Sequence, residues 1–275
     1  MDLTFLDNTV PRRPYQPDNP LTANNIHKGQ KKLLCCLQEF LTHAFTDFHV
    51  TRNSEVYVVY VGAAPGTNII EVATRLPFVH FLLWDPQKFD PNLRRCANVK
   101  LHKREFLPED VQYVKNLCQN AKVFFMSDIR SINYTKELKA SSPQQAMSMV
   151  CEDMRLQESW CREIRPKAAL LKFRLPWNLQ HKFDYLPGKV FVQAFARSDS
   201  TESRLYVTNF NKTKFYDTLL YEEQMHYVNT VLRPNDNFDA KRAANIRCEF
   251  GRMCSNLDVK HLQEMSQYNI YLIST

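Results

Sequence analysis

The chain has 275 residues, a formal net charge of +7 and a pI near 8.9. This length fits one large α/β domain with appendages, and the basic excess favours an anionic partner such as RNA, although many soluble proteins are as basic. No apolar run approaches the length of a membrane span, and the acidic start MDLTFLDN lacks a signal-peptide core. The eight cysteines include no Cys-x-x-Cys pair, so no zinc spacing is present and reduced thiols in a cytosol-like compartment are expected.

Taken in order, the chain begins with an irregular arm over residues 1–26, in which four prolines recur. Apolar spacing then predicts a helix over 28–48, strands over 56–61, 79–84 and 99–102, a helix over 108–120, a strand over 122–126, a helix over 142–164, strands over 168–172, 189–193 and 203–209, helices over 216–232 and 240–250, and finally a short helix and a strand-like 269–273. This order predicts a mostly parallel, seven-stranded sheet with one antiparallel strand and helices on both faces. We expect an arm over 1–26, a main domain over 27–235 and a helical appendage over 236–275 packed on that domain.

A glycine-containing turn follows the first strand of the main domain. The apolar run 56–61 stops at Gly62, the turn continues through Ala64, Pro65 and Gly66, and helical spacing begins after it. Two of the chain's five glycines lie in this turn, which suggests that a ligand approaches the backbone closely. The turn lacks the lysine of a P-loop and the three glycines of a dinucleotide site, so it suits S-adenosylmethionine (SAM) better than a diphosphate. An ordinary tight turn between a strand and a helix is the alternative.

Charged residues stand where several predicted strands end. Asp85, Asp128 and Lys172 follow or end parallel strands, and Glu202 precedes the predicted antiparallel strand. Because the carboxyl ends of parallel strands share one edge of a sheet, we expect these residues to converge with Lys32 at one pocket. Asp85 could accept hydrogen bonds from the ribose hydroxyls of an adenosine ligand, or it could cap the segment that follows it. Solvated charges at strand ends are the alternative for each residue taken singly.

Six short segments, in order along the chain, carry a family resemblance. They are Gly29–Leu34 (GQKKLL), Tyr60–Thr67 (YVGAAPGT), Ser127–Ser131 (SDIRS), Leu171–Arg174 (LKFR), Thr201–Leu205 (TESRL) and Tyr221–Met225 (YEEQM). With them the chain resembles the poxvirus-type family of cap-specific mRNA (nucleoside-2′-O)-methyltransferases, whose members also serve as regulatory subunits of poly(A) polymerase. It is similar, more distantly, to FtsJ-type RNA ribose methyltransferases. The resemblance covers residues from about 15 to 230, and the last forty or so residues match poorly.

The resemblance implies a Rossmann-like SAM-dependent methyltransferase fold with a catalytic Lys-Asp-Lys-Glu tetrad. The matching positions are Lys32, Asp128, Lys172 and Glu202. Lys172 would deprotonate, or merely hold, the ribose 2′-hydroxyl. The family's SAM site falls on Gln30, Tyr60, Gly62, Ala64, Pro65, Gly66, Asp85, Phe106 and the shared Asp128. An arginine that the family has two residues after the strand-end aspartate is Gln87 here, which is a departure.

The resemblance also implies a pocket for a 7-methylguanosine (m7G) cap. Two aromatic residues, Tyr15 from the arm and Trp177, would hold the base between them, and Glu222 would bond its edge. A second acidic position of the family falls at or beside Leu179. RNA phosphates would meet arginines next to tetrad residues, namely Arg130, Arg174 and Arg204, for which surface salt bridges are the alternative. The cluster of Lys241, Arg242, Arg247 and Arg252 near the end is either RNA-facing or solvated.

The function that the resemblance implies is SAM-dependent methylation of the ribose 2′-hydroxyl of the first transcribed nucleotide in m7G-capped RNA. Its setting would be the cytoplasm, including a viral factory or virion, with no membrane partner and no metal. Two alternatives stay open. One is an RNA-binding subunit that assists the catalytic subunit of a poly(A) polymerase, and the other is an enzyme that methylates internal RNA riboses.

Overall fold

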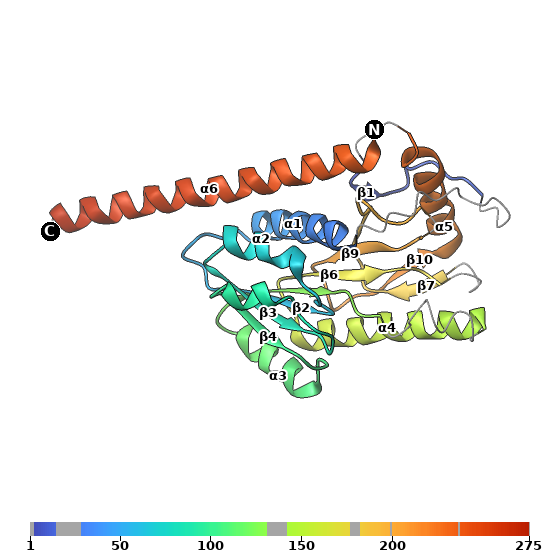
Figure 1. The fold of residues 1–275 in the computed structure, drawn as a ribbon, viewed down its shortest axis with the longest axis horizontal. Coiled ribbons are helices and arrows are strands. Elements are labelled where there is room, and N and C mark those ends of the chain that lie inside the picture. The colour runs from blue at the N-terminus through green and yellow to red at the C-terminus, as the bar shows by residue number, and fades with distance from the viewer. Residues whose placement is uncertain are drawn as a thin grey trace.

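An eight-stranded sheet runs through the molecule and carries helices on both faces (Figure 1). The structure is a computed structural model that describes residues 3–14, 29–130, 142–176, 182–198, 200–235 and 237–274. The sheet order is β1-β8-β9-β6-β5-β2-β3-β4, and β10 pairs with β7 in a separate two-stranded sheet. The α/β fold class expected from the sequence is confirmed.

The bounds of the elements are as follows. The strands are β1 (Phe5–Leu6), β2 (Val56–Val61), β3 (Val79–Trp84), β4 (Val99–His102), β5 (Lys122–Ser127), β6 (Ala168–Phe173), β7 (Lys182–Tyr185), β8 (Lys189–Phe191), β9 (Ser203–Val207) and β10 (Lys214–Asp217). The helices are α1 (Gly29–Asp47), α2 (Thr67–Arg75), α3 (Pro108–Leu117), α4 (Pro143–Ile164), α5 (Thr218–Tyr227) and α6 (Phe238–Ser274), with single turns η1 (Pro91–Arg95) and η2 (Val228–Leu232).

The main sheet differs from the expected seven-stranded sheet in two ways. It has an eighth strand, β1, which pairs antiparallel with β8. Two strands, β1 and β9, therefore run against the others, where one antiparallel strand was expected. The short strand β1 has only two residues, so its sequence carries no alternating pattern that would predict it.

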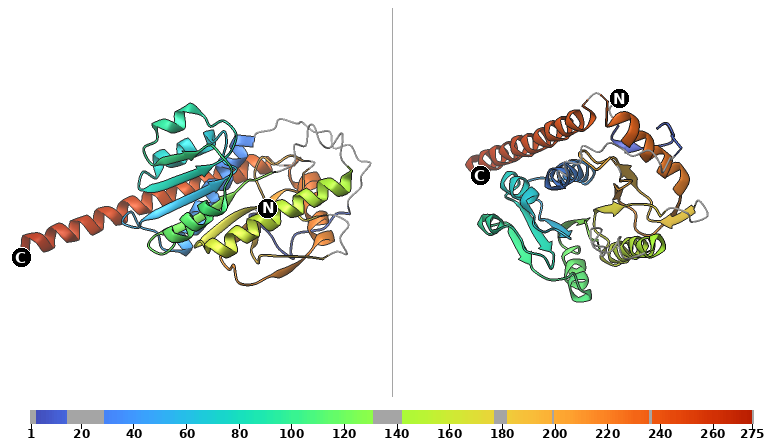
Figure 2. Two further views of the ribbon diagram at one scale, coloured as in Figure 1. Left: turned by 90° about the horizontal axis from the view of Figure 1, so that it is seen from below. Right: turned by 45° about the vertical axis from the view of Figure 1, so that its right-hand side comes forward.

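Strand β2 lies in the middle of the sheet and is covered on both faces. Alternate residues Val56, Val58 and Tyr60 belong to the core shared with α1, α2 and α6. Val59 and Val61 face the other core, which contains side chains of α3 and α4. Figure 2 shows these two helix layers on opposite sides of the strands. Burial on both faces explains why this strand is a continuous apolar run.

Helix α6 is one continuous helix of 37 residues, so the predicted break after residue 250 and the predicted strand over 269–273 are wrong. The apolar residues near the end favour a strand locally, but such preferences depend on a partner strand. Gly251 does not interrupt the helix, because a single glycine costs only about 1 kcal/mol. Phe250 and Leu257 pack α6 into the core that α1 shares, while its C-terminal part extends beyond the body of the molecule (Figure 1).

The predicted helix over 216–232 is divided into three elements. Strand β10 occupies its first residues, α5 begins at Thr218, and a π-helical turn, η2, follows α5. The Asp217 side chain accepts a hydrogen bond from the backbone N–H of Leu220 at 2.9 Å and so caps α5. Pairing with β7 takes residues 214–217 out of the helical pattern.

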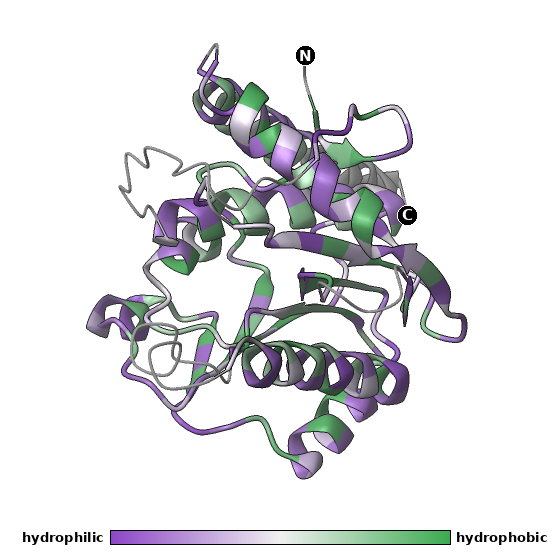
Figure 3. Cartoon of the chain, turned by 90° about the vertical axis from the view of Figure 1, so that its right-hand side faces the viewer, coloured by the Kyte–Doolittle hydropathy of each residue, from purple (hydrophilic) through white to green (hydrophobic). Residues whose placement is uncertain are grey.

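The helices that cover the sheet carry both hydrophilic and hydrophobic residues along their length (Figure 3). An amphipathic helix uses its hydrophobic side to pack on a sheet and exposes its hydrophilic side. Within the described residues, no helix combines the length and the apolar character that crossing a membrane requires.

Candidate active site

The carboxyl ends of β2, β3, β5 and β6 meet at one edge of the sheet. Asp85 follows β3, Asp128 follows β5, and Lys172 is the penultimate residue of β6. Glu202 directly precedes β9, and the antiparallel pairing of β9 with β6 brings it to the same edge. The structure thus brings together the strand-end residues that the sequence analysis expected to converge.

Three of these side chains, Asp128, Lys172 and Glu202, form a compact ionic cluster with Lys32. The Lys172 Nζ lies 2.7 Å from the Asp128 Oδ1 and 3.8 Å from the Glu202 Oε2. Lys32, from the first turn of α1, places its Nζ 2.8 Å from the Glu202 Oε1. The two lysine side chains keep about 15% exposure, so the cluster is shielded but reachable.

Arg204 is a fifth member of this ionic cluster. The structure contradicts its expected contact with RNA phosphates. Its side chain is fully buried, and its guanidinium lies 2.8 Å from the Asp128 Oδ1 and 3.6 Å from the Glu202 Oε1. The Arg204 Nε donates to the Gln193 Oε1 at 3.0 Å. A buried, fully engaged guanidinium cannot reach a phosphate in solvent. Arg130 also pairs with Glu202, but it lies at the exposed rim.

Burial and neighbouring charges set the protonation of the cluster. Burial lowers the pKa of Lys172 from its ordinary value, Asp128 and Glu202 oppose this shift, and Arg130 and Arg204 reinforce it. Burial acts to raise the pKa of Asp128 and of Glu202, but the surrounding cations outweigh it and lower both. The two carboxyls are therefore charged at neutral pH, and Lys172 loses its proton more readily than an exposed lysine.

A cavity of about 650 Å³ opens beside the cluster, a size typical of small-molecule sites. Of the residues expected to hold SAM, those that line it are Gln30, Gly62, Ala64, Asp85, Phe106 and Asp128. Tyr60, Pro65 and Gly66 do not line it. Tyr60 is 1% exposed and packs in the core beneath α1, so its side chain does not face the cavity.

Gly62, which lines the large cavity, is required by the chain's own backbone. Its φ is +78°, and a Cβ there would lie 2.7 Å from the backbone carbonyl carbon of Asp128. The glycine therefore lets β2 and β5 end in close contact, which sets the position of Asp128.

Asp85 and Gln30 each hold part of the cavity wall together. The Asp85 carboxylate accepts the backbone N–H groups of Ala64 at 3.0 Å and Gln87 at 2.8 Å, so it does cap the following segment. The Gln30 Oε1 accepts the Thr67 hydroxyl at 2.7 Å and the backbone N–H of residue 68 at 3.3 Å. Gln30 thereby caps α2 from outside, because Gly66 at the N-cap position has no side chain to do so.

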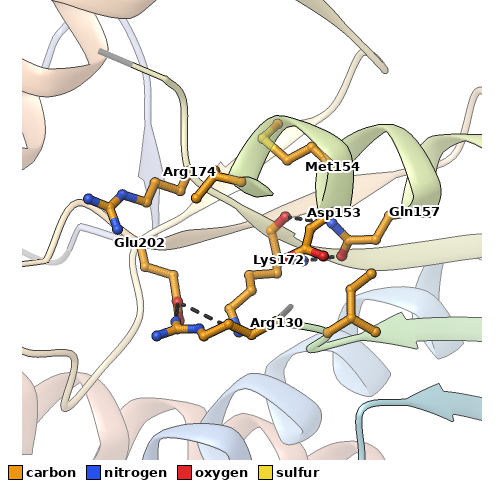
Figure 4. A pocket seen from close by; sticks show the side chains of 9 residues that line it. Arg130, Asp153, Met154, Gln157, Lys172, Arg174 and Glu202 are labelled. Atoms are coloured by element: carbon orange, nitrogen blue, oxygen red, sulfur yellow. Dashed lines mark hydrogen bonds and ion pairs between the residues drawn. The ribbon is translucent and has the colours of Figure 1, made fainter. Parts of the chain in front are cut away.

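A second, smaller cavity of about 30 Å³ lies on the α4 side of Lys172 (Figure 4). Arg174, Asp153 and Glu202 line this space. Lys172 and Arg130 line both cavities. Lys172 thus stands between a large cavity and a small one, with its ammonium group held by carboxylates.

The expected cap-binding residues are only partly placed. Tyr15 and Trp177 lie outside the described residues. Glu222 is on α5, and burial together with Glu223 raises the pKa of its carboxyl. The described end of the arm runs along this helix, since the backbone N–H of Arg13 donates to the Glu223 carbonyl at 3.1 Å.

Sequence reasoning missed two buried glutamines at the site. Gln193 accepts from Arg204 and donates from its Nε2 to the Glu202 carbonyl at 2.8 Å. Gln157 on α4 bonds the backbone of Lys172. Gln193 ends the predicted strand 189–193 but lies in none of the matched segments, and Gln157 lies inside the predicted helix 142–164, so neither was singled out.

Comparison with known proteins decides the family. The model of the family described as poly A polymerase regulatory subunit matches residues 3–271. The chain belongs to this family. It is also 30% identical over 229 residues to the cap-specific mRNA (nucleoside-2′-O-)-methyltransferase of Fowlpox virus (strain NVSL), covering 77% of this chain and 70% of that protein. The resemblance drawn from the sequence is confirmed, and so is the expected methyltransferase class.

Similar solved structures are distant. A co-crystal structure of WbdD with the kinase inhibitor LY294002 has a TM-score of 0.34 at 12% identity, covering 66% of this chain and 43% of that one. The MycE methyltransferase from the mycinamycin biosynthetic pathway has a TM-score of 0.27 at 10% identity, covering 66% and 49%. The chain spans less than half the length of these solved chains. Membership of the family therefore rests on the sequence comparisons.

Proposed function

We propose that this member of the family transfers the methyl group of SAM to the ribose 2′-hydroxyl of the first transcribed nucleotide in m7G-capped mRNA. The observation that carries the proposal is the position of Lys172, which lines both the large cavity and the small one. A methyl donor in the first would lie beside its amine, and the second, which at about 30 Å³ is too small for a ribose, marks the side from which the ribose hydroxyl would approach. The cap-specific mRNA methyltransferase activity for which the Fowlpox virus relative is named supports the choice of capped mRNA as substrate.

The residues of the large cavity fit SAM. Each Asp85 oxygen accepts one backbone N–H, and a carboxylate oxygen has a second lone pair that a ribose hydroxyl can use. Asp128 lines the same cavity, and its pKa is lowered, so a negative charge is available to a cationic ligand. When bound, SAM supplies a methyl group activated by the neighbouring sulfonium.

Lys172 has the central part in this proposal. Its lowered pKa makes the neutral amine more accessible than in an exposed lysine, and this amine can accept the proton of the 2′-hydroxyl. The 2′-oxygen would then take the methyl group as the bond from that group to the SAM sulfur breaks, which leaves S-adenosylhomocysteine. Asp128, 2.7 Å from the Nζ, then stabilises the resulting ammonium. Glu202, held by Lys32 and Arg204, keeps a second carboxylate beside the amine. Holding the hydroxyl in line contributes alongside the proton transfer.

The RNA would approach from the side of Arg130 and Arg174, which line the small cavity. A planar guanidinium suits phosphate recognition. We assign the cap to Tyr15, Trp177 and Glu222 on the strength of the family resemblance. The hydrogen bond from the Arg13 backbone N–H to the Glu223 carbonyl supports a contribution of the arm, because it holds the described end of the arm against α5.

The test is methyl transfer from labelled SAM to two short RNAs that differ only in the m7G cap. Wild type should methylate the capped RNA, and Lys172→Ala should lose transfer at least about 100-fold, as expected for a lost proton acceptor. Circular dichroism and SAM binding of the variant provide the control for folding. A folded Lys172→Ala variant that retains activity would rule out the assigned role.

A second function is favoured by the family's description as a poly A polymerase regulatory subunit. This binding role would be supported by two results together. Wild type would bind SAM without transferring a methyl group, and it would lengthen the poly(A) tails that a poly(A) polymerase makes. Transfer without any dependence on the cap would instead indicate an enzyme of internal RNA riboses.

A further inference from the structure

The backbone of Lys172 lies where the ladder between β5 and β6 has just ended. The last paired residues of that ladder are Ser127 and Leu171, because β5 stops there and Asp128 turns toward the cluster. On the other side, Lys172 is paired with Arg204 of β9. On the side of β5, strand β6 therefore has no strand partner at Lys172, the residue to which the proposed function assigns the proton transfer.

Gln157 of α4 takes the place of that missing partner. The backbone N–H of Lys172 donates to the Gln157 Oε1 at 3.1 Å, and the Gln157 Nε2 donates to the Lys172 carbonyl at 3.3 Å. A carboxamide offers one donor and one acceptor side by side, as a peptide group of a neighbouring strand does. These bonds are drawn as dashed lines in Figure 4, and they are shielded from water because Gln157 is 1% exposed.

We propose that Gln157 is a positioning residue that fixes the backbone of Lys172 and thereby aims its amine between the two cavities. The inference rests on the proposed methyl transfer. The amine must keep its distance of 2.7 Å to Asp128 while facing the hydroxyl, and a displacement of about 1 Å can cost roughly 100-fold in rate.

A merely structural role would be to hold α4 on the sheet, and the same helix offers a matched control for it. Arg162 ties α4 to the loop after β9 by donating to the carbonyls of Phe210 at 2.6 Å and Lys212 at 3.2 Å. Arg162→Met removes these side chain–backbone bonds, together with the ion pair that Arg162 makes with Glu158 at 2.7 Å, but it leaves every bond to Lys172 in place. Gln157→Met removes the two bonds to the Lys172 backbone.

The experiment compares both variants with wild type in single-turnover methyl transfer at saturating SAM and capped RNA. Gln157→Met should slow transfer roughly 10- to 100-fold with a SAM dissociation constant within about twofold of wild type. Arg162→Met should lose stability but keep its transfer rate within about twofold. An unchanged rate in Gln157→Met, or an equal loss in both variants, would overturn the proposal. Gln157→Glu retains the acceptor for the Lys172 N–H, so its rate should be intermediate, and it serves if the methionine variant does not fold.

A second readout does not depend on activity. Mass spectrometry can follow the acetylation of Lys172 by acetic anhydride, and we expect faster acetylation in Gln157→Met than in wild type or Arg162→Met, because the amine leaves its carboxylate partner. Equal acetylation rates would also overturn the proposal. If wild type transfers no methyl group, the proposed function fails, and the acetylation rates still decide whether Gln157 positions Lys172.

Discussion

Lys172 shows how a single residue is tuned by opposing effects. Burial disfavours its charged form, whereas Asp128 and Glu202 favour it, and the net result is a lowered pKa. A group with a lowered pKa becomes neutral at a lower pH than an exposed lysine. The amine is then available to accept a proton over a wider range of pH.

This tuning predicts the pH dependence of transfer. The rate constant for transfer at saturating substrates should rise with pH and reach a plateau. The apparent pKa of this rise should lie below 10.5, the ordinary lysine value. Lys172→Arg should abolish the rise and most of the activity, because a guanidinium does not deprotonate in proteins. Single-turnover rates from roughly pH 6 to 10 provide the measurement. A rate of wild type that is flat across this range would argue that Lys172 only positions the hydroxyl.

Replacing Gly62 by alanine should destabilise the protein, and the same replacement at Gly251 is the control. Gly62→Ala places a Cβ against the Asp128 backbone at a φ of +78°, so it should cost roughly 1–3 kcal/mol in the free energy of unfolding and weaken transfer. At Gly251, within α6, nothing lies within 4 Å of an added Cβ, so alanine should stabilise by about 0.5–1 kcal/mol. Urea unfolding of both variants measures the contrast, and similar effects would contradict it.

Among the elements, those with strong patterns were predictable and those set by partners were not. Strands β2, β3 and β5 are mostly apolar runs, and a glycine or an aspartate follows each of them. The sequence therefore predicted both the strands and the site at their ends. Strand β1 is defined only by β8, nearly 190 residues away. Arg204 and Gln157 lie inside elements, and only the packing shows that Arg204 binds the Asp128 carboxylate and that Gln157 binds the Lys172 backbone.

Helix α2 depends on a cap that comes from another element. Gln30→Ala removes the acceptor that serves Thr67 and the backbone N–H of residue 68, and it should lower the free energy of unfolding by about 0.5–2 kcal/mol. Gln112→Ala on α3 is the control, because Gln112 makes an exposed side-chain bond to Asn116 and should change stability by less than about 0.5 kcal/mol. Unfolding is measured without SAM, so that ligand binding does not mask the difference.

In the whole molecule, a buried ion pair joins the end of the chain to its beginning. The Arg242 guanidinium lies 2.7 Å from the Glu39 Oε1 and donates to the Thr4 carbonyl at 3.4 Å. Arg242 is 3% exposed and Glu39 6%, so Arg242 is neither RNA-facing nor solvated, which were the two expectations for its cluster. Helix α6, α1 and the first residues of the chain are thus tied at one point.

Breaking this pair should affect the whole molecule. Arg242→Met removes the guanidinium that binds both oxygens of the buried Glu39 carboxylate, and it should cost about 3–5 kcal/mol in the free energy of unfolding. Adding Glu39→Met should restore much of the loss, because the buried carboxylate is then gone. Calorimetry of the single and double variants gives the coupling, and strictly additive losses would show that the pair contributes nothing.

The same pair constrains how the protein can fold during synthesis. Glu39 leaves the ribosome long before Arg242, since 203 residues separate them. Until α6 emerges, a nascent chain that closed α1 over the sheet would bury the Glu39 carboxylate without Arg242 beside it. Strand β1 likewise has no partner strand until β8 has been synthesised. We therefore expect α1 to pack only loosely on the sheet while the chain is still on the ribosome. A message that is cut short before codon 242 yields a chain without Arg242, the residue that ties α6 to α1.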